Sequence, residues 1–152
     1  MTIIEIMIVV TIIGILGIIA IPHVIDARRR SRDSRFLSTL RQITGNASDF
    51  YGFEFGDFPP DAAPGVAPPL IKPYLPDRFV WENNTSIGGN WDWDRAASRS
   101  EKIHGIYAGL SIHQPARTRA QMEEIDLKID DGDLDTGVFR GHSNGFIFIL
   151  EP

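Results

Sequence analysis

The chain has 152 residues, a formal net charge of −5 and no cysteine. This length suits one small domain plus an additional segment, and the lack of cysteine excludes disulfides, thiolate chemistry and cysteine-bound metals. The four histidines are His23, His104, His113 and His142. Their spacing matches no metal-binding motif, and no nucleophile elbow or phosphate-binding loop occurs, so an enzyme is not expected.

The charge is distributed unevenly along the chain. Residues 1–41 contain six arginines and three acidic residues, whereas residues 42–152 contain nine basic and seventeen acidic residues. This polarity suits the packing of copies, with the basic stem of one against the acidic part of another. A solvated basic stem explains the arginines equally well. Nucleic-acid binding is a weaker alternative, because no aromatic residues are interleaved with the arginines.

The N-terminal 25 residues form an apolar segment. No formal charge occurs between Ile6 and Ile25 when His23 is neutral. About twenty helical residues are long enough to cross the hydrocarbon layer of a bilayer. Glu5 is the exception, since a carboxylate in lipid is costly unless it is paired. The α-amino group of Met1 is the nearest possible partner, and the pattern predicts a transmembrane helix over residues 1–25.

This N-terminus resembles that of mature type IV pilins and type II secretion pseudopilins. Those proteins begin with an aromatic or apolar residue followed by T-L-I-E and an apolar helix containing Gly and Pro. Here Met1 stands first, Thr2 and Glu5 match, and Gly14 and Pro22 lie where the family has helix-loosening residues. The leader that a prepilin peptidase removes is absent, so the sequence is interpreted as the mature form.

The resemblance implies a structural subunit of an extracellular filament. The chain would be held in the inner membrane, cut and N-methylated at Met1 by a prepilin peptidase, and extracted by an ATPase-driven machine into a helical homopolymer. Glu5 would then neutralise the Met1 amino group of a neighbouring subunit. Two alternatives stay open: a pseudopilin that forms short periplasmic filaments for secretion, and a minor tip pilin that binds DNA or a surface.

The helix is expected to be weak between Gly14 and Pro22. Proline lacks a backbone donor and clashes with the preceding turn, and Gly14 and Gly17 each cost about 1 kcal/mol relative to alanine. We expect this stretch to be extended in an assembled filament. A continuous helix with a kink at Pro22 is the expectation for the membrane-bound monomer.

Residues 26–52 are predicted to continue the same helix. Asp26 to Arg35 is polar on nearly every face and is typical of a solvated stem. An apolar stripe at helical spacing follows. Its residues are Phe36, Leu40, Ile43, Ala47 and Phe50, with Leu37 and Tyr51 beside them. The stripe is expected to pack on a sheet, and Gly52 and Gly56 to end the helix.

Residues 53–152 are predicted to form a globular head. A loop rich in proline and glycine leads to an alternating strand around Trp91 and Trp93, with Asp92 directed outward. A strand over 105–112, a helix over 115–129 and a central apolar strand over 145–150 follow. The fold class is therefore α+β, with a long N-terminal helix packed on a small antiparallel sheet. Tyr51 and the G-D-F-P sequence at 56–59 are similar to the corresponding region of some pseudopilins.

An acidic loop at 130–137 is the single candidate ion site. Asp131, Asp133 and Asp135 supply oxygen ligands of the kind calcium prefers, and major pseudopilins hold calcium in a C-terminal loop. The preferred interpretation is a solvated turn whose aspartates satisfy local backbone groups. No other cofactor is expected.

Two further surface features are candidates. Asn83 and Asn84 begin glycosylation sequons in a predicted loop. A group of aromatic residues could line contacts between subunits instead of the core. Its members are Phe53, Phe55, Phe58, Trp81, Trp91 and Trp93.

Overall fold

The computed structural model describes residues 2–152, apart from the side chains of Ala47 and Phe50. Met1 and these two side chains, all named in the sequence analysis, therefore lie outside the described part. Contacts divide the chain into two compact units, Met1–Ser34 and Arg35–Pro152.

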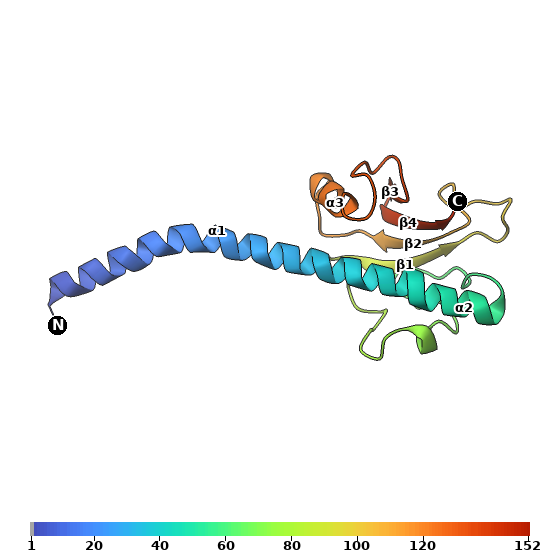
Figure 1. Ribbon diagram of the computed structural model, residues 1–152, viewed down its shortest axis with the longest axis horizontal. Helices are drawn as coiled ribbons and strands as arrows, with labels where there is room; N and C mark the ends of the chain where they lie inside the picture. Colours follow the sequence, from blue (N-terminus) through green and yellow to red (C-terminus); the bar gives the residue numbers. More distant parts are fainter. Residues whose placement is uncertain (1) are drawn as a thin grey trace. The chain divides into compact units, whose positions relative to one another are not determined.

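The N-terminal part of the chain is helical as far as Phe55 (Figure 1). An α-helix, α1 (Ile3–Arg41), is followed by a π-helix, η1 (Gln42–Ala47), and a second α-helix, α2 (Ser48–Phe55). Gly56 then adopts a left-handed conformation with φ of 75°, and its N–H donates to the Gly52 carbonyl at 2.8 Å. A glycine in this conformation is a common helix stop, so Gly56 ends the helix as predicted, whereas Gly52 lies inside α2 and the helix continues past the predicted bound of residue 52.

The π-helix was not predicted. Its hydrogen bonds enclose one more residue than those of an α-helix, which rotates the following helix relative to an uninterrupted α-helix. Among the side chains that the structure describes here, Ile43, Thr44, Ser48 and Tyr51 are buried, at 0%, 9%, 2% and 6% exposure. The Thr44 hydroxyl donates to the Leu40 carbonyl at 2.9 Å within this segment.

Four antiparallel strands form a single sheet in the order β1-β2-β4-β3. The strands are β1 (Asn90–Arg95), β2 (Ala108–His113), β3 (Phe139–His142) and β4 (Gly145–Glu151). The central position of β4 confirms the prediction made from its continuous apolar run. The β3 strand was missed because its four residues include Arg140 and Gly141 and show no apolar alternation.

The core lies between one face of the sheet and the helical residues of the second unit. The rings of Phe36 and Trp91 stack with centroids 5.4 Å apart. Leu40 and Ile43 continue the helical side of this core, as the apolar stripe predicts. The short helix α3 (Arg119–Asp126) adds Met122 and Ile125. The predicted α+β architecture is thus confirmed.

The outward direction predicted for Asp92 is wrong. Asp92 and Asp94 are each only 8% exposed, because the second face of the sheet is also covered. Part of the cover comes from the chain between β1 and β2. A Cβ atom on Gly109 would lie 2.7 Å from Cδ1 of Ile106, and the His104 ring lies 4.4 Å from the His142 ring.

The aromatic group divides between core and surface. Trp81, Trp91 and Trp93 are at most 2% exposed, so their predicted role in subunit contacts is wrong. The indole N–H of Trp93 donates to the Pro59 carbonyl at 2.8 Å, which fixes the proline-rich loop beside β1. In contrast, Phe53 is 93% exposed.

The Gly88-Gly89 pair permits a close approach of two loops. Gly88 and Gly89 have φ angles of 85° and 76°, in the left-handed region that favours glycine. A Cβ atom on Gly89 would lie 2.4 Å from the His113 carbonyl oxygen at the end of β2. The left-handed backbone conformation and the lack of room for a Cβ atom therefore both require glycine at residue 89.

We expect Gly89→Ala to destabilise the head by at least about 2 kcal/mol, since strain and overlap add. Gly45→Ala is the matched control, because a Cβ atom there meets nothing within 4 Å. Thermal unfolding of the full chain in detergent measures both. Equal melting temperatures for the two variants would contradict the close-approach argument.

Candidate functional site

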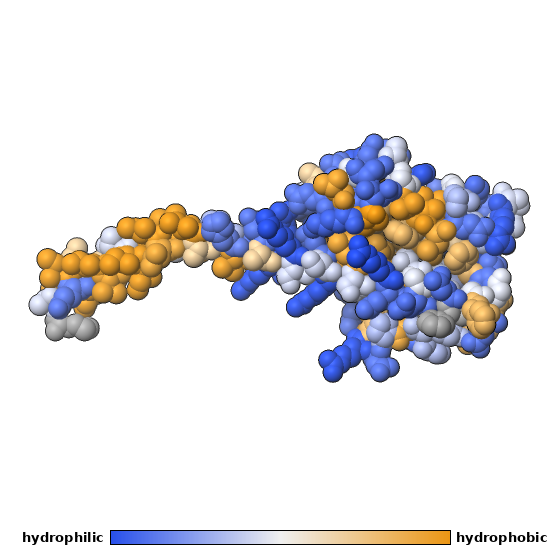
Figure 2. Space-filling view, in the orientation of Figure 1, coloured by the Kyte–Doolittle hydropathy of each residue, from blue (hydrophilic) through white to orange (hydrophobic). Residues whose placement is uncertain are grey.

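The apolar N-terminal segment is a helix whose side chains are exposed in the isolated chain. All large apolar side chains from Ile3 to Ile25 are between 49 and 81% exposed, and Figure 2 shows them as a continuous hydrophobic surface. By length and composition, this helix is apolar enough to cross a membrane, with a mean hydropathy of 2.9 over 18 residues. An apolar surface of this extent requires a lipid or protein environment.

Thr2 and Glu5 form a reciprocal cap at the start of α1. The Thr2 N–H and hydroxyl donate to Glu5 Oε2 at 2.6 and 3.0 Å, and the Glu5 N–H donates to Thr2 Oγ1 at 3.4 Å. This arrangement is a capping box, which satisfies backbone donors at a helix start. Its T-x-x-E spacing was visible in the sequence, but this local role was missed. Pairing of Glu5 with Met1 concerns a residue outside the described part and stays a prediction.

Gly14 and Pro22 both lie inside α1, and the helix continues through them. This is the form expected for a single membrane-bound chain. A Cβ atom on Gly14 would meet nothing within 4 Å, so its small size leaves an open position on the helix surface. The extended conformation predicted for an assembled filament stays a prediction.

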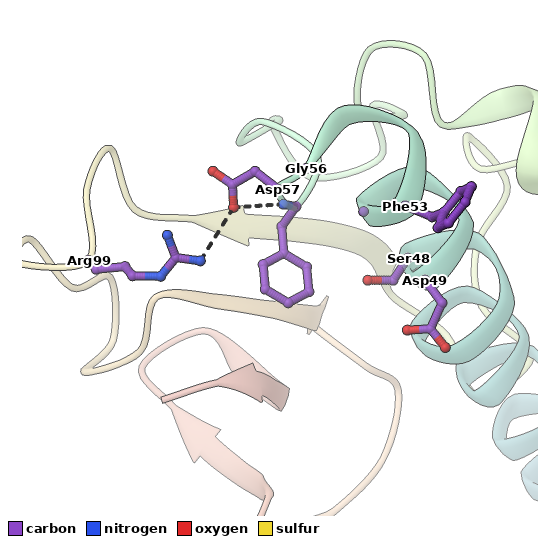
Figure 3. A pocket seen from close by; sticks show the side chains of 8 residues that line it. Ser48, Asp49, Phe53, Gly56, Asp57 and Arg99 are labelled. Carbon is purple, nitrogen blue, oxygen red and sulfur yellow. Dashed lines mark hydrogen bonds and ion pairs between the residues drawn. The ribbon is translucent and has the colours of Figure 1, made fainter.

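A pocket of about 410 Å³ lies between α2 and the chain after β1, and is called the α2 pocket below (Figure 3). It is lined by Ser48, Asp49, Gly52, Phe53, Gly56, Asp57, Phe58 and Arg99.

Asp57 fixes one wall of the α2 pocket. Its carboxylate accepts the Phe58 N–H at 2.8 Å, the Tyr107 hydroxyl at 2.9 Å and an Arg95 N–H at 3.1 Å. Burial alone would raise the pKa of Asp57, but these hydrogen bonds and the positive charges of Arg95 and Arg99 lower it below its ordinary value. The carboxylate is therefore ionised at neutral pH.

Arg99 completes this wall and is itself held by several partners. Its guanidinium donates to both carboxylate oxygens of Glu151, at 2.6 and 3.2 Å, and lies 4.5 Å from the centre of the Tyr107 ring. It also lies 3.8 Å from Asp57. On this side of the pocket, the positive charge of Arg99 is thus held in place by the negative charges of Glu151 and Asp57.

The three predicted calcium ligands already have protein partners. Asp131 accepts the N–H of Asp133 at 2.9 Å, and Asp133 accepts the N–H of Asp135 at 3.0 Å. Asp135 pairs with Arg119 of α3 at 2.8 Å. Among the described residues, no three His, Cys, Asp or Glu side chains are arranged to hold a metal ion. The geometry is that of a turn stabilised by its own aspartates, and calcium binding stays a prediction.

Asp126 is a buried carboxylate beside this loop that sequence reasoning missed. It is fully buried, and neither oxygen makes a well-formed hydrogen bond within the described chain. Burial, together with the negative charges of Asp131 and Asp130, raises the pKa of Asp126 to about 6. The signal was its position beside Ile125, on the apolar face of α3.

The glycosylation candidates Asn83 and Asn84 are both exposed, in a loop before β1. The hydroxyl of Thr85, which belongs to the first sequon, donates to the Gly88 carbonyl at 2.6 Å. Accessibility is compatible with a glycan, and modification stays a prediction.

No protein-family profile matches the sequence, and no curated protein matches it. Among solved structures, the major type IV pilin PilA1 from Clostridium difficile is similar to this chain. The TM-score is 0.55 at 13% identity, and the match covers 82% of this chain and 97% of the other. The chain has the type IV pilin fold.

The long N-terminal helix and the antiparallel sheet of this chain agree with that fold. At this identity the similarity concerns the fold, and the roles of individual residues rest on their own geometry.

Asp126 predicts a pH dependence of stability in this pilin fold. Its pKa in the folded state is about 6, against an ordinary value of 3.8. The folded chain therefore binds the proton more tightly than the unfolded chain, so stability falls as pH rises from about 4 to about 6, by at most about 3 kcal/mol.

We expect Asp126→Asn to melt at a higher temperature than the unmodified chain at pH 7.5 and at a similar temperature at pH 4. Asparagine keeps the shape of the side chain but cannot ionise. Thermal unfolding of the full chain in detergent at both pH values provides the measurement. A difference of the same size at pH 4 and pH 7.5 would show that ionisation of Asp126 is not the cause.

Proposed function

We propose that the chain is a structural subunit of an extracellular type IV pilin-like filament, held in the inner membrane before assembly. The observation that carries this proposal is the uniformly exposed apolar helix from Ile3 to Ile25. Lipid would cover this surface before assembly, and the helices of other copies would cover it in the filament core. Processing and N-methylation at Met1 by a prepilin peptidase belong to the same proposal.

A pseudopilin of a type II secretion system is the second candidate. The observation that favours it is the G-D-F-P sequence, whose Asp57 is fixed by Tyr107 and Arg95. A pseudopilin would use the same apolar helix in short periplasmic filaments. The minor tip pilin that binds DNA or a surface is a further variant with less support.

Electron microscopy of filaments sheared from the cell surface, with mass spectrometry of their subunits, tests the main proposal. A major filament subunit is expected to dominate the sheared material. Absence of the chain from surface filaments, together with loss of protein secretion on its deletion, would favour the pseudopilin. Unassembled chain with no filament in either compartment would contradict both.

Glu5 variants separate its local role from its role between subunits. Glu5→Gln can still close the capping box, because glutamine also accepts the Thr2 N–H, but it carries no charge. If Glu5 neutralises an amino group of another copy, Glu5→Gln and Glu5→Ala should both strongly reduce filament yield while the chain stays in the membrane. Normal assembly of Glu5→Gln would assign Glu5 to helix capping alone.

Calcium binding at the acidic loop is a separate proposal, and the buried, unsatisfied carboxylate of Asp126 supports it. Asp131, Asp133 and Asp135 would have to exchange their present partners for the ion. If they do, millimolar calcium should raise the melting temperature of the full chain relative to chelator, and Asp131→Asn should abolish the difference. An unchanged melting temperature in calcium and in chelator would remove the site.

A further inference from the structure

The α2 pocket contains a carboxylate that the rest of the chain does not pair. Asp57 and Arg99 are held by Tyr107 and Glu151, as described above. Asp49 is exposed in the first turn of α2 and makes no hydrogen bond or ion pair within the described part of the chain. Figure 3 shows Ser48 pointing from α2 toward the space in front of Asp57 and Arg99, whereas the carboxylate of Asp49, which also lines the pocket, points away from these two residues. The charged lining residues leave one net negative charge in the pocket.

Phe53 adds an aromatic surface at the edge of this pocket. At 93% exposure it is the most exposed large apolar side chain that the structure describes, and it is one of the lining residues. An exposed aromatic ring offers a partner a large apolar contact surface. Aromatic faces beside a carboxylate favour a flat cation, which gains from both the charge and the ring.

The chain itself carries a set of such cations in its stem. All six basic residues among residues 1–41 are arginines, and the three lysines occur only at 72, 102 and 128. Arg28, Arg30 and Arg35 are exposed. The planar guanidinium of arginine can make two-point contacts with carboxylates and can stack on aromatic rings.

We propose that the α2 pocket receives an arginine side chain from residues 28–35 of a second copy, with its guanidinium on the Asp49 carboxylate and against the Phe53 ring. The inference rests on the proposed filament, because assembly would bring the stem of one copy to the head of another. The volume of about 410 Å³ suits a long side chain rather than a single inorganic ion. The opposite net charges of stem and head favour the same pairing.

Disulfide cross-linking tests the contact directly, because the natural chain has no cysteine. Asp49→Cys is combined in the full chain with cysteine at one of the stem arginines, and filaments are oxidised. The stem positions are Arg28, Arg29, Arg30, Arg32 and Arg35. We expect a ladder of cross-linked oligomers for at least one combination. The control, Asp77→Cys with the same stem variants, uses an exposed acidic residue elsewhere on the head and should give no ladder.

Charge exchange tests the interaction rather than proximity. Asp49→Arg should lower filament yield about tenfold or more, because it places like charges at the contact, whereas Asp77→Arg should leave it near normal. Phe53→Ala should give a smaller loss. Replacement of the cross-linking arginine by aspartate in the Asp49→Arg chain should restore assembly. Melting temperatures of the full-length variants in detergent identify any that fail to fold.

The outcomes separate this inference from the proposed function. If the unmodified chain forms no filament in either compartment, the proposed function fails and the pocket contact fails with it. If unmodified filaments form and a folded Asp49→Arg chain assembles as well as Asp77→Arg, only the pocket contact is overturned. Absence of ladders at all five stem positions, or failure of the charge exchange to restore assembly, also overturns it.

Discussion

An apolar helix with exposed side chains is the constraint on which the rest of the structure depends. From Ile3 to Ile25 every large apolar side chain is exposed, and burial of such surface contributes about 25 cal/mol per Å² wherever lipid or protein provides it. The isolated chain cannot supply that cover. A segment of this kind therefore specifies an environment outside the chain, and the pilin fold places a separate folded head after it.

Residues 35–152 form one compact unit, in which the sheet is covered on both faces. On one face Phe36 and Trp91 join the amphipathic part of the helix to β1. On the other, Asp92 and Asp94 are buried beneath the connection to β2, and burial next to Asp94 raises the pKa of Asp92 to about 7. A carboxyl group whose pKa is raised by folding lowers stability as the pH rises above its ordinary pKa.

Features determined by local pattern could be predicted, and features determined by tertiary contacts could not. The apolar run from Gly145 to Leu150 and the stripe through Phe36 and Leu40 are visible in the sequence and lie where expected. The π-helix was not predictable from the sequence. It rotates the following part of the helix, and that rotation depends on the surface against which the helix packs. Burial of Asp94 and Asp126 depends on loops whose paths have no periodic signal. The Thr2–Glu5 cap was visible but was interpreted only as a charge in need of a partner.

The geometry of this cap indicates how one carboxylate can serve a chain in two environments. Both contacts from Thr2 use Oε2 of Glu5, so Oε1 takes no part in them. In a single membrane-bound chain, the hydrogen bonds from Thr2 reduce the cost of holding the carboxylate near lipid. In a filament, an amino group from another copy could bind Oε1 without opening the cap, so the energy of the inter-subunit pair would not be offset by loss of helix capping. The helix cap and the pairing with another copy are then compatible, because they use different carboxylate oxygens of Glu5.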